Sequence, residues 1–267
     1  LEVSGIIEKV GKEVQGLKEG DEVVGLSAWG AFAEYVKLDS KFVVRKSENM
    51  PFEVAASMTI NYGTSYYALV ERARIREGQK ILILGASGGI GLSAIEISKA
   101  FNCNVTAVAS SKQKLETCEK YGADNLILNN SNNLKESLKE QQAGKFDLIY
   151  DTIGGQDTID SLSFVEWEGQ ILIMGFASGD IASVPVNKIL LKGCNLIGIF
   201  WGPFARGNTN FNLQSIKEVC NLYEKELLQI SDPELYLIND FKEAMSKIKN
   251  RESIGKLCFY TEAFSKS

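Results

Sequence analysis

The chain has 267 residues, of which 45% are apolar and 24% are charged, a composition typical of globular proteins. Its formal net charge of −5 gives no reason to expect binding to nucleic acid or to acidic membranes. No apolar run approaches the roughly 20 residues that cross a bilayer. Histidine is absent and the five cysteines are scattered, which excludes hydrolases with a catalytic histidine and zinc sites built on histidine. We expect free thiols in a reducing, cytoplasmic compartment.

Residues 1–60 are predicted to be rich in β-structure. Short apolar segments at 5–11, 22–25 and 42–44 are separated by glycine-containing turns, and 30–37 alternates partly between apolar and polar residues. Several short strands joined by such turns favour a small barrel or sandwich. Because residues 1–8 already resemble the interior of a strand, we expect the sequence to be part of a longer protein.

The pattern changes near Pro51. Residues 52–69 are predicted to be helical, with an interruption at 61–64, and from Lys80 onward strands and helices alternate. The predicted strands are 81–84, 105–109, 126–128, 146–150, 170–174 and 195–200, and the predicted helices between them are 90–101, 112–121 and 134–141. The strands are almost continuously apolar, as expected where helices cover both faces of a parallel sheet. We therefore predict an α/β fold with a doubly wound parallel Rossmann sheet.

Two further helices are predicted at 211–228 and 241–249, followed by a terminal strand at 255–260. We expect this tail to pack back on the β-rich first part.

The strand that ends at Leu84 leads directly into a glycine-rich turn, residues 85–91, and then into a helix. Glycines let the backbone approach a dinucleotide diphosphate, and the helix begins with unpaired N–H groups and a partial positive charge. The alternative is a tight β–α turn with no ligand. Short-chain dehydrogenases have a similar loop near their N-terminus, but 84 residues precede this one, and no tyrosine here has a lysine four residues later.

The end of the next strand indicates which dinucleotide is bound. An NAD enzyme usually has a carboxylate there for the ribose hydroxyls. Here Ser110, Ser111, Lys112 and Lys114 follow the strand, and no carboxylate occurs before Glu116. Hydroxyls and lysines suit a 2′-phosphate, which predicts NADPH as the cofactor. The alternative is that the lysines mark only a solvated start of a helix.

Several segments, in this order and spacing, resemble the zinc-independent quinone oxidoreductases, the zeta-crystallin-like branch of the medium-chain dehydrogenase/reductase superfamily. The matching segments are Glu2-x-x-Gly5 with Gly11 and Val14, then 18–23, 61–65, 85–91, 121–124, 150–155, 174–176 and 188–202. The resemblance implies a partial GroES-like catalytic domain at 1–60, a Rossmann NADPH-binding domain at 61–205 and a C-terminal return to the catalytic domain at 206–267. It also implies that roughly the first 60 residues of the catalytic domain are missing.

The resemblance assigns cofactor contacts but no catalytic side chain. Tyr62 and Thr64 would border the nicotinamide, with Phe200 and Trp201 along it. The remaining implied contacts are Gly88, Gly89 and Ile90 to the diphosphate, Ser110, Ser111 and Lys114 to the 2′-phosphate, Asn129 near the adenine, Gly175 and Phe176 beside the ribose, and Lys256 from the tail. The family often has tyrosine at the position of Asn129. Core packing is the plain alternative for Phe176, Phe200 and Trp201, and we prefer a loop or helix cap for Asp151.

The implied activity is zinc-independent hydride transfer from NADPH to a quinone or a similar conjugated carbonyl. Leu1 stands where the alcohol dehydrogenases have a zinc-binding histidine, and alcohol oxidation without a Lewis acid is unfavourable. Three alternatives stay open: a 2-enoyl or enone reductase of the same superfamily, a non-catalytic NADPH-binding protein of the crystallin or RNA-binding kind, and a zinc alcohol dehydrogenase. The expected partners are a small-molecule quinone or enone and a second copy in a homodimer, with no nucleic acid and no membrane.

Overall fold

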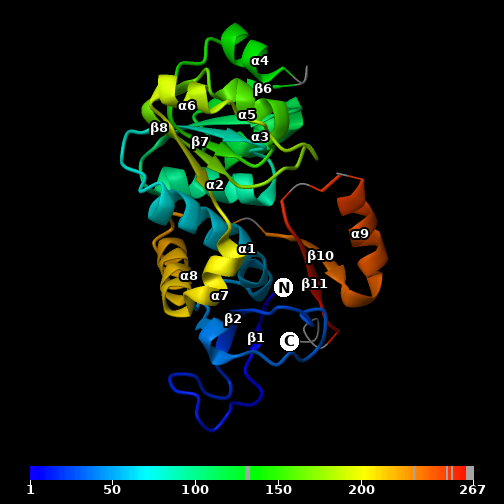
Figure 1. The fold of residues 1–267 in the computed structure, drawn as a ribbon. Helices are drawn as coiled ribbons and strands as arrows, with labels where there is room; N and C mark the ends of the chain where they lie inside the picture. The colour runs from blue at the N-terminus through cyan, green and yellow to red at the C-terminus, as the bar shows by residue number, and fades with distance from the viewer. Residues whose placement is uncertain (130–132, 231, 251, 254, 263–267) are drawn as a thin grey trace. The chain divides into compact units, whose positions relative to one another are not determined.

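The computed structural model describes residues 1–129, 133–230, 232–250, 252–253 and 255–262 (Figure 1). The chain divides into two compact units. Unit 1 comprises Leu1–Thr64 and Gly202–Ser267, and unit 2 comprises Ser65–Trp201. The C-terminal quarter of the chain therefore belongs to the same unit as its beginning.

Unit 2 is built on a six-stranded parallel sheet in the order β6-β5-β4-β7-β8-β9. The strands are β4 (Lys80–Leu84), β5 (Asn104–Ala109), β6 (Asn125–Leu128), β7 (Phe146–Asp151), β8 (Val165–Ile173) and β9 (Asn195–Gly198). The strand order reverses between β4 and β7, and ligands of doubly wound sheets bind at the carboxyl ends of the strands at such a reversal. The predicted doubly wound parallel sheet is confirmed.

Helices cover both faces of this sheet. They are α2 (Gly89–Ala100), α3 (Lys112–Lys120), α4 (Leu134–Glu140), α5 (Gly155–Ser161) and α6 (Val186–Lys192). On one face Leu82 and Leu84 join a buried cluster with Leu134 and Leu138 of α4. Ile83 points to the opposite face because side chains alternate along a strand, and it too is fully buried. Figure 1 shows α4 and α6 on one side of the sheet and α2 on the other. This two-sided burial explains the continuous apolar runs in the sequence.

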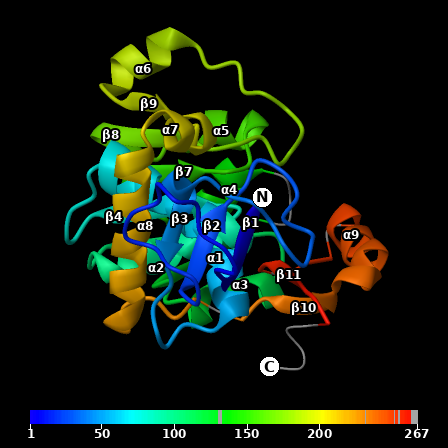
Figure 2. The ribbon, with the colours of Figure 1, turned by 90° about the horizontal axis from the view of Figure 1, so that it is seen from below.

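Unit 1 contains two small sheets. The antiparallel sheet consists of β1 (Glu2–Ile6), β2 (Glu22–Leu26) and β3 (Val43–Arg45), and the parallel pair consists of β10 (Glu234–Leu237) and β11 (Leu257–Tyr260). The helical segments are η1 (Ser40–Phe42), α1 (Phe52–Tyr66), α7 (Trp201–Gly207), α8 (Thr209–Glu224), η3 (Ile238–Asp240) and α9 (Phe241–Lys249). The tail contacts the first part directly, since the ring of Phe32 lies 4.6 Å from that of Phe259. Figure 2 shows α8 and β10–β11 from a second direction.

One local prediction is wrong. Residues 61–64 do not interrupt the helix: α1 runs through them, and a π-helix, η2 (Tyr67–Arg72), continues it. Asn61 and Gly63 are buried, and tertiary packing of this kind overrides their weak helix propensity. Residues 30–37, where apolar and polar residues alternate only partly, form a bent loop in which Phe32 and Tyr35 are exposed.

The predicted helix 211–228 ends earlier, at Glu224. Glu226 adopts a left-handed backbone with φ +56°, and the N–H of Leu227 bonds back to the carbonyl of Leu222. This is a Schellman-type helix end, here without the usual glycine. The helices α5, α6 and α7 and the strand β10 were not predicted from the sequence. None of the described helices is long and apolar enough to cross a membrane.

Candidate dinucleotide-binding site

At two positions the glycine turn after β4 leaves no room for a side chain. Gly85 has φ +71°, and a Cβ there would collide with the hydroxyl of Thr152. A Cβ on Gly91 would lie 2.5 Å from the carbonyl oxygens of both Gly85 and Ala86. These positions therefore require glycine for the turn to close and for α2 to start against it.

The start of α2 presents bare backbone amides. Gly88 is its N-cap and offers no side-chain cap, and the first helical bond runs from the N–H of Leu92 to the carbonyl of Gly88. The N–H groups of Gly89, Ile90 and Gly91 precede this bond and so have no intrahelical acceptor. Gly88 is exposed, Gly89 and Ile90 are half-buried, and Gly91 is buried. This arrangement suits a diphosphate, because amide donors and the helix dipole meet at one accessible point.

Of the residues after β5, Ser110 and Lys114 are available to bind a phosphate, and Ser111 caps the next helix. The Lys114 Nζ donates to the Ser110 Oγ at 3.4 Å, so the structure brings these two predicted phosphate contacts together. The Ser111 Oγ accepts from the backbone N–H of Lys114 and caps α3. Lys112 is exposed, and no acidic side chain stands between Ala109 and Lys114. A positive charge, from Lys114, and a hydroxyl group, from Ser110, thus lie side by side directly after β5.

A second loop lies against the glycine turn at the end of β7. The Thr152 Oγ1 donates to the carbonyl of Leu84 at 2.8 Å. Asp151 is fully buried and accepts from the N–H groups of Ile153 and Gly154 and from the Thr158 hydroxyl. Asp151 therefore caps the loop, one of the two roles predicted for it, whereas the N-cap of α5, Gly154, has no side-chain cap. Sequence reasoning assigned no role to Thr152, although it stands directly after a strand and within the matching segment 150–155.

The predicted ribose contacts follow β8 and pack along this loop. The N–H of Ala177 bonds to the carbonyl of Thr152, and a Cβ on Gly154 would lie 2.7 Å from the Phe176 ring. Gly175 lies beside the Thr152 carbonyl, and Phe176 is 45% exposed. The structure therefore places Gly175 and Phe176 against the loop that follows β7, and this loop in turn contacts the glycine turn through Thr152.

The other predicted residues of unit 2 differ in their exposure. Asn129 follows β6, and its side-chain oxygen accepts from the Ser137 hydroxyl at 3.2 Å. Phe200 is 76% exposed, whereas Trp201 is buried and its indole N–H has no hydrogen-bond partner among the described residues. Trp201 therefore packs in the core, as the alternative interpretation had it, whereas Phe200 does not.

Tyr62, Thr64 and Lys256 belong to unit 1. Tyr62 is buried within α1 and Thr64 is half-buried near its end. The Lys256 ammonium pairs with the carboxylate of Glu2, whose other oxygen accepts from the N–H of Ile60 at 2.8 Å. Lys256 thus already has one anionic partner, and its predicted contact with the cofactor stays a prediction.

Sequence reasoning also missed a buried group of hydroxyls directly behind the turn. Ser65, Ser93 and Tyr150 are each fully buried and joined by hydrogen bonds of 2.8 Å. Ser65 and Tyr150 are separated by 85 positions, so no local pattern in the sequence could have revealed their contact.

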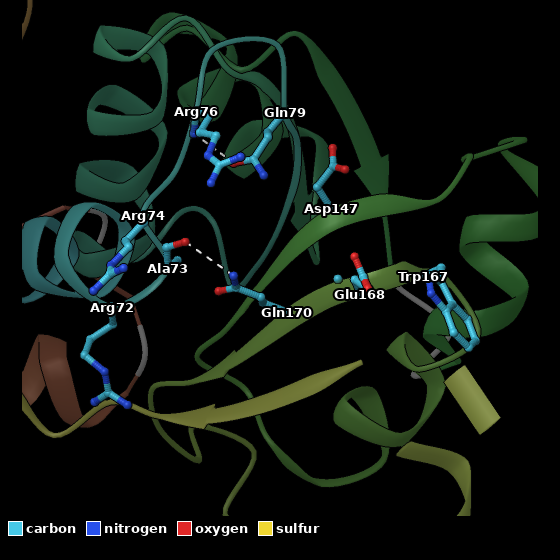
Figure 3. Close-up of a pocket in the computed structure, with 10 residues that line it drawn as sticks. Arg72, Ala73, Arg74, Arg76, Gln79, Asp147, Trp167, Glu168 and Gln170 are labelled. Carbon is cyan, nitrogen blue, oxygen red and sulfur yellow. Dashed lines mark hydrogen bonds between the residues drawn. The ribbon is translucent and has the colours of Figure 1, made fainter. Parts of the chain in front are cut away.

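A cavity of about 520 Å³ lies elsewhere on unit 2 (Figure 3). Its lining includes Arg72, Arg74 and Arg76, with Asp147 at the start of β7 and Trp167 near the start of β8. These residues lie at the amino ends of the strands. The glycine turn lies at the carboxyl ends, so this cavity is not the predicted dinucleotide site.

No cysteine of this chain has the properties of a nucleophile. Burial raises the pKa of the Cys103 and Cys258 thiols to about 11 and that of Cys118 to about 12. It also raises the pKa of Cys194 and Cys220. Reactive cysteines have a lowered pKa instead. Among the residues that the structure describes, no three His, Cys, Asp or Glu side chains gather as metal ligands would.

Two family models match the chain. "Alcohol dehydrogenase GroES-like domain" matches residues 1–48, within unit 1, and "Zinc-binding dehydrogenase" matches residues 89–216, from the start of α2 onward. The first match agrees with the expected partial GroES-like domain.

Known proteins with similar sequences include reductases. Quinone oxidoreductase-like protein 2 of Rattus norvegicus is 30% identical over 259 residues, which are 96% of this chain and 74% of that protein. The 2-methylene-furan-3-one reductase of Solanum lycopersicum is 37% identical over 163 residues, which are 57% of this chain and 40% of that protein. Among solved structures, the quinone oxidoreductase of Escherichia coli complexed with NADPH matches with a TM-score of 0.85 and 25% identity, covering 97% of this chain and 80% of that one.

Proposed function

Because the chain belongs to the medium-chain dehydrogenase/reductase superfamily, we propose that it is an NADPH-dependent reductase of quinones or similar conjugated carbonyl compounds. The observation that carries the proposal is the pairing of Lys114 with Ser110 at the end of β5, beside a glycine turn that exposes free amides. The first feature suits a 2′-phosphate and the second suits a diphosphate.

The residues of unit 2 fit such a dinucleotide in two places. Of the predicted diphosphate contacts, Gly89 and Ile90 would donate their first-turn amides, whereas the Gly88 N–H already bonds to the carbonyl of Gly85. The N–H of Gly91, which was not among the predicted contacts, would be a third donor. Lys114 and Ser110 would bind the 2′-phosphate through a charge-assisted bond and a hydroxyl. The Ser111 hydroxyl already caps α3, so it would contribute less to binding of the 2′-phosphate than Ser110 and Lys114.

The chemistry divides between the cofactor and the protein. When bound, NADPH supplies a hydride to the conjugated system of the acceptor, whose carbonyl oxygen then takes up a proton. The protein positions the acceptor and excludes water, which is sufficient for an electron-poor acceptor. Tyr62, Thr64, Phe200 and Lys256 are proposed contacts near the reacting end, and no catalytic side chain is assigned.

A second candidate is reduction of a conjugated C=C bond. The identity to 2-methylene-furan-3-one reductase is higher, 37%, than the identity to the quinone oxidoreductase-like relative, 30%, although it extends over fewer residues. The name of that enzyme describes a ketone with a conjugated methylene group. Both candidates use the same cofactor site and differ only in the acceptor.

A panel of acceptors separates the candidates. Purified chain is mixed with NADPH and with a benzoquinone, a naphthoquinone, a methylene ketone or an enoyl thioester, and loss of NADPH absorbance is followed. Faster turnover of quinones supports the first candidate, and faster turnover of enones supports the second. NADPH binding without turnover of any acceptor would contradict both and favour a non-catalytic NADPH-binding protein.

We also propose that the chain forms a homodimer through the β9 edge of its sheet. β9 pairs only with β8 in the described structure, so its other side offers unpaired backbone groups. On α6, Val186, Leu190 and Leu191 are 83%, 79% and 74% exposed, and Leu196 of β9 is partly exposed. An antiparallel pairing of two β9 strands would satisfy the edge and cover these side chains in one interface.

Light scattering tests the proposed dimer. We expect twice the mass of the chain, and half of that mass for a variant with Leu190→Glu and Leu191→Glu. Ile6→Glu, at an exposed position of unit 1, is the control and should stay dimeric. A wild-type chain that is monomeric at high micromolar concentration would contradict the proposal.

A further inference from the structure

A chain of buried hydroxyls ends at the first turn of α2. The Tyr150 hydroxyl lies 2.8 Å from the Ser65 Oγ, which in turn lies 2.8 Å from the Ser93 Oγ. Both serines also donate to one carbonyl oxygen, that of Ile90, at 3.1 Å from Ser65 and 2.9 Å from Ser93. The three side chains are fully buried and come from α1, α2 and β7.

The protons of this chain run in one direction. Burial raises the pKa of Tyr150, so the phenol keeps its proton. The Ser65 hydroxyl has one proton and can give it to the Ile90 carbonyl, which only accepts, and this leaves the phenol as the donor to Ser65. Ser65 can then donate onward to Ile90 or Ser93, and Ser93 donates to Ile90. Each hydroxyl proton is used, and the sequence of donors ends on the Ile90 carbonyl.

The Ile90 carbonyl matters because of the peptide plane to which it belongs. A peptide unit is planar, so the oxygen of Ile90 and the N–H of Gly91 turn together. The Gly91 N–H is one of the amides at the start of α2 that have no intrahelical acceptor. Fixing the Ile90 oxygen from behind therefore fixes the direction in which the Gly91 N–H points.

Ser65 lies at a distinctive place in the chain. It belongs to the last turn of α1, and the π-helix η2 begins two residues later, at Tyr67. π-Helical turns are rare and often occur at functional sites. The serine hydroxyl thus attaches the glycine turn to a segment whose backbone is already unusual.

We propose that Tyr150, Ser65 and Ser93 are positioning residues, which orient the first-turn peptide of α2 toward the diphosphate of the bound dinucleotide. This rests on the proposed function for the identity of the ligand. The role differs from mere stabilisation of the core, because it predicts a loss of diphosphate binding that is separate from any loss of folding stability.

The test compares Ser65→Ala, Tyr150→Phe and the double variant, with calorimetric binding of NADPH and NADH and thermal unfolding for each. Ser65→Ala should lower the affinity for both dinucleotides about tenfold, which corresponds to the loss of one hydrogen bond. The ratio of the two affinities should stay unchanged, because both dinucleotides carry the diphosphate. Tyr150→Phe should weaken them less, since Ser65 still reaches Ile90.

The double variant separates positioning from stability. Ser65→Ala alone leaves the buried Tyr150 hydroxyl without a partner, and adding Tyr150→Phe removes that group. The double variant should therefore regain melting temperature relative to Ser65→Ala but should not regain affinity. Affinity that rises and falls with melting temperature across these variants would overturn the proposal.

Two control variants complete the comparison. Ser98→Ala removes a buried hydroxyl that has no hydrogen-bond partner among the described residues, at the other end of α2. Ile81→Val lowers packing at the far end of β4, where Ile81 is fully buried. Both should leave dinucleotide affinity unchanged. Equal weakening by Ile81→Val at a matched melting temperature would overturn the proposal.

If the wild type binds neither dinucleotide, the proposed function fails, and inorganic pyrophosphate then tests the positioning role. The amide resonance of Gly91 should shift with pyrophosphate in the wild type and in Ser98→Ala, and should shift less in Ser65→Ala. No shift in the wild type, or equal shifts in all three, would overturn the positioning role as well.

Discussion

The Lys114 ammonium lies 3.4 Å from the Ser110 hydroxyl, where β5 ends and α3 begins. A cation and a hydroxyl therefore occupy the place where an NAD enzyme usually has a carboxylate. Lys114→Ala should weaken NADPH binding about tenfold or more, since hydrogen bonds to charged groups contribute about 1.5–3 kcal/mol, and Ser110→Ala should weaken it less. Calorimetry measures both.

The matched control for this experiment is Lys120→Ala, at the exposed far end of α3. It removes the same charge from the same helix and should leave NADPH affinity within about twofold. Equal weakening by Lys120→Ala would mean that net charge, and not the site at the end of β5, determines binding.

Gly91 is predicted to tolerate no side chain. Its Cβ would lie 2.5 Å from two backbone carbonyl oxygens, which cannot move away as a flexible side chain could. Gly91→Ala should reduce the free energy of unfolding by about 3 kcal/mol or more, at the upper end of the effects of overpacking, and should abolish dinucleotide binding. Urea denaturation measures the first effect.

Gly144→Ala provides the comparison, because a Cβ at Gly144 meets no atom within 4 Å and the backbone there is not left-handed. Its unfolding free energy should match that of the wild type. A Gly91→Ala variant as stable as Gly144→Ala would show that α2 does not start as closely against the turn as the structure indicates.

Asp157 should make stability depend on pH. Burial, followed by the charges of Asp151 and Asp160, raises the pKa of Asp157 to about 6 from an ordinary value of 3.8. The folded state then binds more protons than the unfolded state between these two values, so Asp157 lowers stability as the pH rises through that window. Asp157→Asn should stabilise the protein near about pH 7.5 by about 1 kcal/mol, a figure already discounted for partial exposure.

The gain from Asp157→Asn should disappear below about pH 4, where the folded and unfolded forms are both protonated. Thermal unfolding between these pH values measures the difference. Glu119→Gln, on the exposed side of α3, is the control and should change stability little at any pH. A gain from Asp157→Asn that is constant with pH would contradict the assigned pKa.

The negative charge of Glu2 is compensated by an ion pair with Lys256. The carboxylate side chain is only 8% exposed and also accepts the N–H of Ile60. Lys256→Ala should cost about 2 kcal/mol of stability by leaving this carboxylate unpaired, and adding Glu2→Gln should recover most of the loss. Chemical denaturation of both variants checks this expectation. NADPH affinity of the recovered double variant then measures any direct contact of Lys256 with the cofactor.

Local chemistry made the core of the site predictable from the sequence. The strand, glycine turn and helix around Gly85 and Gly91 follow from close approaches that only glycine permits. The serine and lysine after β5 could be identified because they follow an apolar strand within five residues. The helix 241–249 was predicted with its correct bounds because its apolar residues recur with helical spacing.

Features that depend on long-range contacts were not predictable. The hydroxyl chain joins Ser65 to Tyr150 across 85 positions. Both residues lie in segments that resemble the family, but no local pattern indicates that their hydroxyls meet. The interruption expected at 61–64 is absent because burial of Asn61 and Gly63 outweighs their propensities. β10 has two exposed and two half-buried residues, so its four positions lack the alternation by which strands are recognised.

The relative affinity of the wild-type chain for NADPH and NADH tests the central claim most directly. With calorimetry at one fixed ionic strength, NADPH should bind at least about tenfold more tightly than NADH, the difference that one charge-assisted contact to the 2′-phosphate provides. Lys114→Glu should reverse or remove this preference. Equal affinity of the wild type for the two dinucleotides would contradict the assignment of Ser110 and Lys114 as the 2′-phosphate site.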